Sequence, residues 1–269
     1  MDHGQDVIRE TTESGLVCLK SRLLDTSAVV DHFLTLRDDG AGSANNMGLH
    51  VGNDPDTVIA NRRRVLTDHG MSLDRLVVAS QVHGDRVSRV SLADGGRGAT
   101  DHRQAIGGTD ALVTDEPGLA LMTFFADCVP VFLADRKGRA AGLVHAGWKG
   151  VALRNSARTV EAFREHWNIG PEDLLAVIGP AIGHCCFRIR RDVAEALEHA
   201  CLGACVLRSR DGLRADLPAA VCRTLTDAGV NRDQIRVWPL CTSCGQGPFH
   251  SHRRDGVSSG RMAGVIMLK

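Results

Sequence analysis

Short apolar runs bounded by turn residues alternate along the chain with amphipathic segments. Runs of this kind are typical of buried strands. From Val151 onward the period changes, and apolar residues from Leu153 to Trp167 recur on one helical face. We therefore expect strands over 27–36, 75–82, 119–125, 129–134, 140–144, 174–178, 235–238 and 262–267, and helices over 54–70, 151–167, 190–200 and 215–228.

Capping residues support two of these helices. Asp54 precedes Pro55, which places an N-cap acid before a proline in the first turn. Gly229 follows the last expected helix and is typical of a C-terminal cap. The order of elements predicts a mixed α/β or α+β protein with a substantial sheet.

The organisation along the chain favours one continuous domain. Two Gly-rich polar stretches, 38–48 and 94–108, are expected to be loops, and apolar residues resume directly after the second at 111–113. No internal repeat or low-complexity block interrupts the pattern.

Composition excludes several classes of function. The 269 residues carry 32 Lys and Arg against 32 Asp and Glu, so the basic excess of a nucleic-acid or anionic-membrane binder is missing. Without Tyr, and with three Trp and seven Phe, a stacking platform for single-stranded nucleic acid is not expected. The most apolar stretch is interrupted by Asp127, and the N-terminus lacks the apolar core of a signal peptide. Nine scattered cysteines are typical of reduced thiols, so a cytoplasmic location is expected.

Three segments place a metal-binding side chain where an expected strand meets a loop: His83 in 81–84, Cys128 in 126–130 and His145 in 144–150. If 129–134 and 140–144 form a hairpin centred near residues 136 and 137, Cys128 lies opposite His145. Directly opposed Cβ atoms are roughly 5 Å apart, close enough to share a metal or to form a thiolate–imidazole pair. A register slip would break this arrangement.

The position of His83 cannot be derived from its spacing. If it joins the other two residues, three protein ligands leave a fourth position open, which is the pattern of catalytic zinc. The alternative is that Cys128 is a small buried apolar side chain and that the histidines are structural.

Other chemical groups give weaker signals. Cys241 and Cys244 form a CxxC pair, but His250 and His252 follow at a spacing that fits zinc fingers poorly, so ordinary thiols are favoured. The adjacent Cys185 and Cys186 are expected to pack rather than to form a disulfide. The basic stretch 249–256 with Arg261 predicts either an anion site or a solvated surface, and 147–150 is a possible anion site at a helix start.

These segments, in this order, resemble the YfiH or laccase-domain family, once labelled multicopper polyphenol oxidase, which contains bacterial purine nucleoside phosphorylases and is related to human FAMIN. The resemblance covers 47–268. It is carried by 48–55, 61–63, 81–84, 109–111, 126–130, 145–148, 178–183, 241–242, 251–255 and 260–262.

The resemblance implies a zinc ion held by His83, Cys128 and His145, with copper as an adventitious occupant. It implies an α/β (α+β) fold, a single layered domain with mixed β-sheets flanked by helices, similar to the catalytic domain of cytotoxic necrotizing factors. We assign 20–269 to this domain and 1–19 to an N-terminal segment. Phe187 and His252 stand where the family often has Tyr.

The implied activities are phosphorolysis of adenosine, inosine, guanosine and methylthioadenosine, and deamination of adenosine. The partners are therefore purine nucleosides and phosphate, on a monomer or homodimer. Asp127 is our candidate for proton transfer, although strand alternation turns it away from Cys128. The candidates for holding phosphate are Arg62, Lys149, Arg253 and Arg254.

Three other functions compete with this interpretation. A copper-dependent polyphenol oxidase needs about four coppers and repeated His-x-His pairs, whereas only His250 and His252 have that form. A metal-free thiol hydrolase would use Cys128 and His145 as a dyad. A binding module would bind the same ligands without turnover.

Overall fold

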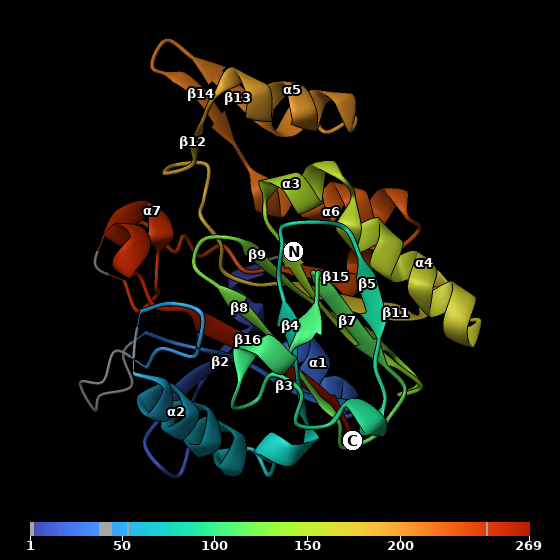
Figure 1. Cartoon of the computed structure of the whole chain (residues 1–269). Helices are drawn as coiled ribbons and strands as arrows, with labels where there is room; N and C mark the ends of the chain where they lie inside the picture. Colours follow the sequence, from blue (N-terminus) through green and yellow to red (C-terminus); the bar gives the residue numbers. More distant parts are fainter. Residues whose placement is uncertain (1–2, 38–44, 53, 246) are drawn as a thin grey trace.

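The protein consists of two large β-sheets packed face to face and covered by helices on both outer faces (Figure 1). The computed structural model describes residues 3–37, 45–52, 54–245 and 247–269. Part of the expected 38–48 loop, residues 38–44, lies outside the described residues. The layered α/β arrangement with mixed sheets confirms the expected fold class.

One sheet has seven strands in the order β1-β2-β3-β16-β8-β4-β6. Its pairs are antiparallel except where β4 pairs with β8 and β6. The strands are β1 (Val7–Thr11), β2 (Val17–Ser21), β3 (Val30–Thr35), β4 (Leu76–Ser80), β6 (Ile106–Gly107), β8 (Ala120–Phe125) and β16 (Met262–Leu268).

The second sheet has six strands in the order β15-β11-β9-β10-β7-β5. Here β11 with β15 and β5 with β7 are parallel, and the central pairs are antiparallel. The strands are β5 (Val87–Arg89), β7 (Ala111–Thr114), β9 (Val129–Asp135), β10 (Ala141–Ala146), β11 (Leu174–Ile178) and β15 (Ile235–Val237).

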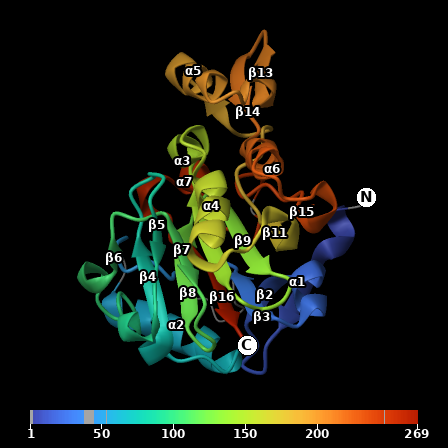
Figure 2. The ribbon, with the colours of Figure 1, turned by 90° about the vertical axis from the view of Figure 1, so that its right-hand side faces the viewer.

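A small third sheet, β12 (Arg188–Ile189), β14 (Gly212–Ala215) and β13 (Val206–Ser209), lies with α5 (Arg191–His199) in a lobe that projects from the main body (Figures 1 and 2). These three short strands were not expected from the sequence, because all but two of their residues are exposed or half-buried and they give no apolar run.

The central strands are buried on both faces, which explains their continuous apolar runs. In β9, Phe132 points into the core between the two sheets, while Val131 and Leu133 point into the core under the helices. In β8, Leu121 faces the inter-sheet core and Met122 the opposite face. The two-residue alternation of strands therefore distributes one apolar run between two cores.

Helices complete the outer layers. Side chains of α2 (Pro55–Asp68) enter the core outside the seven-stranded sheet, and those of α4 (Asn155–Trp167) and α6 (Leu217–Asp227) enter the core outside the six-stranded sheet. The Asp54 carboxylate accepts the Thr57 N–H at 3.0 Å, which confirms the expected cap. The short helices α1 (Arg22–Ser27), α3 (Trp148–Ala152) and α7 (His252–Asp255) complete the set. Within the described residues no helix is both long and apolar enough to cross a membrane.

The expected single helix from Val151 is wrong at its start. The segment forms two helices, α3 and α4, separated by Arg154 with a φ of 58°. Helix α3 begins directly after β10, and the side-chain amide of Asn155, at the start of α4, donates to the carbonyl of His145 at 3.0 Å. This hydrogen bond attaches the start of α4 to the end of β10.

The predicted hairpin between β9 and β10 is present, but its predicted register is wrong by two residues. His145 lies opposite Pro130 rather than Cys128. The centre of the turn lies one residue further along the chain than expected, because the Asp135 N–H bonds to the Ala140 carbonyl at 2.9 Å and its carboxylate accepts the Arg139 N–H at 3.0 Å. A slip of two residues keeps every side chain on its face, so the Cys128–His145 neighbourhood survives the error.

The structure places no domain boundary between residues 19 and 20. That point falls inside β2, and Leu16 and Cys18 are buried. The buried Asp6 carboxylate accepts hydrogen bonds from Ser21 Oγ at 2.7 Å and from Trp238 Nε1 at 2.9 Å. Residues 7–19 are therefore part of the layered domain, since β1 and β2 close one edge of its larger sheet.

Candidate metal centre and its cavity

Two histidines and one cysteine converge where loops leave both sheets. His83 follows β4, Cys128 precedes β9 and His145 lies near the end of β10. One ligand atom from each residue lies within 4.8 Å of the others, and the two imidazole rings meet edge to face with centroids 4.9 Å apart. The structure thus brings together the three residues that the sequence proposed, including His83, whose position spacing could not predict.

Asp110, directly before β7, organises this cluster. Its buried carboxylate accepts the backbone N–H groups of Val82, His83 and Gly84 at 3.1, 3.0 and 2.7 Å. It also lies 2.8 Å from Nδ1 of His145, and its carbonyl accepts the His145 N–H at 2.7 Å. Because Nδ1 is engaged, Nε2 of His145 is the atom available to a metal, which is how second-shell carboxylates orient metal-binding histidines.

Two residues of the site have left-handed backbone conformations. His83 has a φ of 60° and Asp127 a φ of 90°. Each such conformation costs about 1–3 kcal/mol for a residue other than glycine. The three N–H bonds to Asp110 stabilise the first turn, and the hydrogen bonds made by the Asp127 carboxylate stabilise the second.

Gly147 leaves the space in which the three ligands meet. A Cβ atom there would lie 2.7 Å from Cδ2 of His83 and 3.1 Å from Sγ of Cys128. Its φ of −73° suits any residue, so the requirement for glycine is steric.

The Cys128 thiol and the His145 imidazole stabilise each other's charged forms. Burial alone raises the pKa of Cys128, but the charge of His145 and hydrogen bonds from His145 and His83 outweigh it and lower the pKa to about 6. Burial lowers the pKa of His145, but the Cys128 thiolate and the Asp110 carboxylate raise it to about 9. Without a metal the pair is therefore thiolate and imidazolium at neutral pH, and a cation at the site would replace the imidazolium proton.

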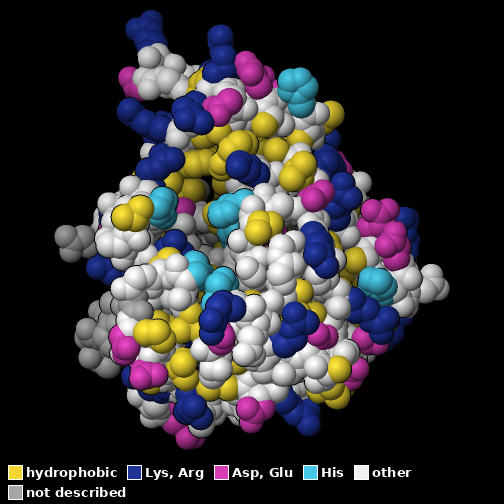
Figure 3. Space-filling model, in the orientation of Figure 1, with side chains coloured by type: hydrophobic (Ala, Val, Ile, Leu, Met, Phe, Trp, Pro, Cys, Tyr) yellow, Lys and Arg dark blue, Asp and Glu magenta, His cyan; other side chains and the backbone are white. Residues whose placement is uncertain are grey.

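The cluster opens into a cavity of about 400 Å³. Its apolar wall is formed by Phe124, Ile182 and Phe187, and its cations are Arg253 and Arg261. Histidine side chains stand around a hollow on this face of the molecule (Figure 3). The remaining lining residues are His50, Gln81, Ala126, Asp127 and His252, together with the three clustered ligands.

Arg261 is the half-buried cation of this cavity. Burial lowers the pKa of its guanidinium, and the nearby Cys128 and Asp127 charges oppose that shift. Burial also lowers the pKa of His50 to about 4, and neighbouring cations act in the same direction. His50 is therefore neutral at pH 7, and Arg253 and Arg261 add positive charge to that of the His145 imidazolium.

Asp127 lines the cavity but its carboxylate is engaged on both oxygens. Oδ1 accepts Thr242 Oγ1 at 2.6 Å, and Oδ2 accepts the Arg253 N–H at 2.6 Å. These bonds tie the turn before Cys128 to the first turn of α7. The proton-transfer role expected for Asp127 stays a prediction.

Among the cations expected to hold phosphate, Arg253 lines the cavity and three others do not. Arg62 is fully buried, and its guanidinium donates to the carbonyls of Met47, Gly98 and Ala99, each at 2.8 Å. Arg62 was wrongly expected at the phosphate site. It lies on the same face of α2 as the buried Val58, Val65 and Leu66, so its side chain is buried with them.

Lys149 and Arg254 also lie outside the cavity lining. The Lys149 ammonium is 5.7 Å from the ring centre of Trp148 on the exposed side of α3. Arg254 pairs with Asp255 at 2.8 Å and donates to the carbonyls of Thr242 and Phe249.

Sequence reasoning missed the roles of two residues of the site, Asp110 and Gly147, whereas Arg261, which it marked as part of a possible anion site, lines the cavity. Each belongs to a stretch that the sequence marked, but only distances show that Asp110 orients His145 and that Gly147 makes room for the ligands. Phe187 and His252, the positions that differ from the family pattern, both line the cavity.

The donor set fits a zinc ion of the catalytic kind. Two imidazoles and one thiolate are common zinc ligands, and three protein ligands leave one position open toward the cavity. Metal-binding histidines usually donate their other ring N–H to a carboxylate or carbonyl, and Asp110 provides this partner for His145.

The chain belongs to the laccase-domain family, whose sequence model, described as "Multi-copper polyphenol oxidoreductase laccase", matches residues 31–269. The chain is 40% identical over 225 residues to "Purine nucleoside phosphorylase YlmD" of Geobacillus stearothermophilus, covering 82% of each chain. It is 36% identical over 165 residues to human "Purine nucleoside phosphorylase LACC1", covering 60% of this chain and 38% of the human one.

The fold is also that of a solved relative. The hypothetical protein YfiH of Bacillus licheniformis superposes with a TM-score of 0.90 at 34% identity, over 97% of this chain and 99% of that one. These similarities confirm the family resemblance seen in the sequence.

Replacing Gly147 by Ala is expected to weaken zinc binding by about 10- to 100-fold, because the added methyl group displaces His83 or Cys128. Competition with a chromophoric chelator measures this affinity. Gly52→Ala is the matched control, since a Cβ there has no neighbour within 4 Å. An unchanged affinity in Gly147→Ala would contradict the assignment of these ligands.

In the metal-free protein, Cys128 is expected to react with iodoacetamide down to about pH 6, because its lowered pKa keeps the thiolate present above that value. Peptide mass spectrometry across a pH series gives the midpoint. Asp110→Asn is expected to move the midpoint upward, since the imidazolium loses its carboxylate partner. A midpoint near the ordinary thiol value of about 8.5 would contradict the pairing.

Proposed function

We propose that this protein is a zinc-dependent purine nucleoside phosphorylase that accepts adenosine, inosine, guanosine and methylthioadenosine. One observation carries the proposal. The cluster of His83, Cys128 and His145 opens into a cavity that has both an apolar wall and two arginines. The names of the relatives given above support the same activity for this fold.

The reaction requires the cavity to hold two ligands of different character. A phosphate oxygen forms a bond to C1′ of the ribose while the C1′–N9 bond breaks. The electron pair of the broken bond stays on the purine, which takes up a proton and leaves as the free base. The site must therefore place a dianion on one side of the sugar and stabilise a planar leaving group on the other.

The lining residues divide along these lines. Phe124, Ile182 and Phe187 provide an apolar surface for the purine and exclude water from it. Arg261 and Arg253 supply the positive charge for phosphate, and the partial burial of Arg261 strengthens its attraction for an anion. Gln81 is held in place because its amide group pairs with both backbone polar groups of Phe124 at 2.8 Å, so it aligns one wall.

A zinc ion on the three ligands would supply a Lewis acid at the inner end of the cavity. His83, Cys128 and His145 would hold it, and Asp110 would keep His145 in the tautomer that binds through Nε2.

We also propose adenosine deamination at the same cavity, with water replacing the C6 amino group and ammonia leaving. The support is the open position of a three-ligand site beside the purine surface. Asp127, next to Cys128, supplies the carboxylate of the described lining and would carry the proton, although Thr242 and Arg253 already occupy both of its oxygens.

The copper oxidase description is less well supported by the donors. The described residues contain two groups of three or more neighbouring His, Cys, Asp or Glu side chains. One group has two histidines and a cysteine, and the other has only cysteines. Neither resembles the histidine-rich cluster that several coppers need. A metal-free thiol hydrolase built on Cys128 and His145 stays the alternative that chelation can exclude.

Adenosine incubated with the zinc-loaded protein is expected to give adenine and ribose 1-phosphate when phosphate is present, with inosine formed with or without phosphate. Chromatography of the products separates the two activities. Cys128→Ala should lose bound zinc and both activities, because one of three ligands is removed. Cys201→Ala, which changes an exposed cysteine in the projecting lobe, is the control.

The outcomes separate the alternatives. Full activity after chelation of zinc, with loss on thiol alkylation, would establish the hydrolase-type dyad instead. The absence of product from adenosine, inosine and methylthioadenosine would contradict the phosphorylase proposal altogether.

Replacing Arg261 by Met is expected to raise the KM for phosphate about tenfold or more and to leave deamination within about twofold, because only phosphorolysis needs the anion. Initial rates at varied phosphate and saturating adenosine measure the effect. Arg191→Met, which alters an arginine side chain that is 88% exposed, is the matched control. Equal loss of both activities would mean that Arg261 supports the shape of the site rather than the phosphate.

A further inference from the structure

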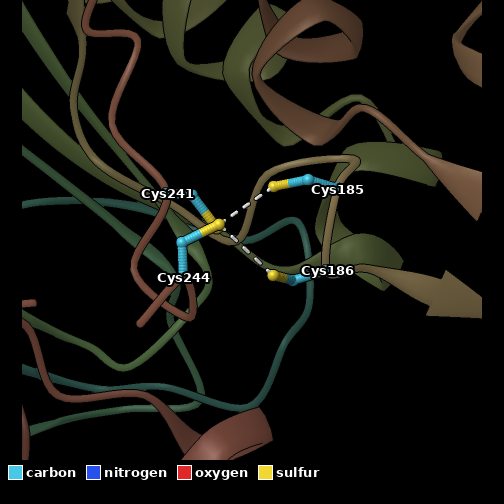
Figure 4. A group of neighbouring side chains, drawn as sticks. All are labelled: Cys185, Cys186, Cys241 and Cys244. Atoms are coloured by element: carbon cyan, nitrogen blue, oxygen red, sulfur yellow. Dashed lines mark hydrogen bonds between the residues drawn. The ribbon is translucent and has the colours of Figure 1, made fainter. Parts of the chain in front are cut away.

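A second group of possible metal ligands lies outside the cavity just described, and it consists of four cysteines. Cys185 and Cys186 come from the loop between β11 and β12, and Cys241 and Cys244 come from the loop after β15. The four Sγ atoms all lie within 4.8 Å of one another (Figure 4). Cys244 Sγ lies 3.3 Å from Cys185 Sγ and 3.5 Å from Cys186 Sγ.

These separations match a single tetrahedral ion. Four thiolates on zinc at about 2.3 Å have sulfur–sulfur distances of about 3.8 Å. An iron–sulfur cluster divides its four thiolates between two or more irons, which needs larger separations than the 4.8 Å limit seen here. A disulfide would need two sulfurs at about 2.05 Å.

The backbone holds the two cysteine loops together without any ion. Ala181 and Cys241 form a parallel β-bridge, in which the Thr242 N–H bonds to the Ala181 carbonyl at 3.0 Å. The Gly183 N–H donates to Cys241 Sγ at 3.2 Å. Hydrogen bonds of this kind accompany thiolate ligands, because they stabilise negative charge on sulfur.

Gly183 leaves room for the sulfurs. A Cβ at this position would lie 3.1 Å from Cys185 Sγ and 3.4 Å from Cys241 Sγ. The structure thus keeps a small residue at the point where ligands from both loops approach, as Gly147 does at the first site.

Three arginines donate hydrogen bonds to backbone carbonyls of the two loops that carry the cysteines. Arg214 donates to the carbonyl of Cys185, Arg253 to that of Cys186 at 3.2 Å, and Arg254 to that of Gly245 at 3.3 Å. A zinc ion with four thiolates carries a net charge of −2, which the guanidiniums of Arg214 and Arg253 would partly offset, whereas Arg254 is already paired with Asp255.

We propose that Cys185, Cys186, Cys241 and Cys244 bind one zinc ion as a structural site, separate from the His83, Cys128 and His145 centre. The ion would join the two loops that carry Phe187 and α7 to the same point. Because Arg253 in α7 bonds to Asp127 and contacts the Phe187 ring at 5.3 Å, the second site would fix one wall of the cavity.

Metal analysis of the full chain, purified with added zinc, tests the proposal. We expect two zinc ions per chain in the unaltered protein and one in Cys128→Ser. The double variant Cys241→Ser with Cys244→Ser should also bind one. The control double variant Cys201→Ser with Cys222→Ser should keep two. Zinc absorption spectroscopy on Cys128→Ser should show four sulfurs at about 2.3 Å.

The number of zinc ions per chain tests the four-cysteine site independently of the proposed phosphorylase activity. One zinc in the unaltered protein that is lost in the Cys241 and Cys244 variant would support the four-cysteine site and contradict zinc at the other centre. One zinc that survives this variant and is lost in Cys128→Ser would overturn the proposal.

If the cysteine variants fail to fold, a measurement on the unaltered protein still tests the proposal. Titration with an organomercurial is expected to release the second zinc as the four thiols react together, and peptide mass spectrometry identifies the protected cysteines. Cys244→His should retain this zinc, since histidine replaces cysteine in many structural sites. A disulfide between the two loops in the zinc-treated protein, or alkylation of all four thiols without loss of zinc, would also overturn the proposal.

Discussion

The Asp110 carboxylate is the interaction on which the first metal centre depends. It accepts three consecutive backbone N–H groups from the turn that carries His83 and lies 2.8 Å from Nδ1 of His145, so a single side chain sets both histidine ligands. Removing it would leave these donors without their partner, at a cost of about 1–3 kcal/mol for each buried group. The left-handed turn at His83 would lose the hydrogen bonds that stabilise it. The candidate site is therefore built around a residue that contacts two of the three ligands and is not a ligand itself.

The rest of the cavity depends on loops rather than on the sheets. Asp127 links the turn before Cys128 to Thr242 and to the N–H of Arg253, so the wall formed by α7 is attached to the metal centre through one carboxylate. The loop that holds Thr242 also carries Cys241 and Cys244 of the four-cysteine cluster. A change at the cysteines would thus reach the cavity through Arg253 and Phe187 without altering the sheets.

The family description and the donors point to different chemistry, and the donors support the zinc proposal. The description names copper and polyphenols, whereas the described ligand groups contain either two histidines with one thiolate or four thiolates. The combination of arginines and an apolar wall beside the first group suits an anion with a planar base. Zinc at both groups, one open and one closed, is consistent with their different ligand counts.

The sequence by itself predicted the central strands β8, β9, β10, β11 and β16, because strands buried on both faces read as continuous apolar runs, but it did not predict the buried strand β7. It also determined which residues could bind a metal, and the even two-residue error in the β9–β10 register left Cys128 and His145 together. Only the tertiary structure decided which of those residues meet. His83 reaches Cys128 through a turn held by Asp110, Arg62 is drawn into the core, and Cys185 and Cys186 lie against Cys241 and Cys244, 55 or more positions further along the chain. Contacts of this range depend on how sheets and loops pack in three dimensions, and no local pattern encodes that.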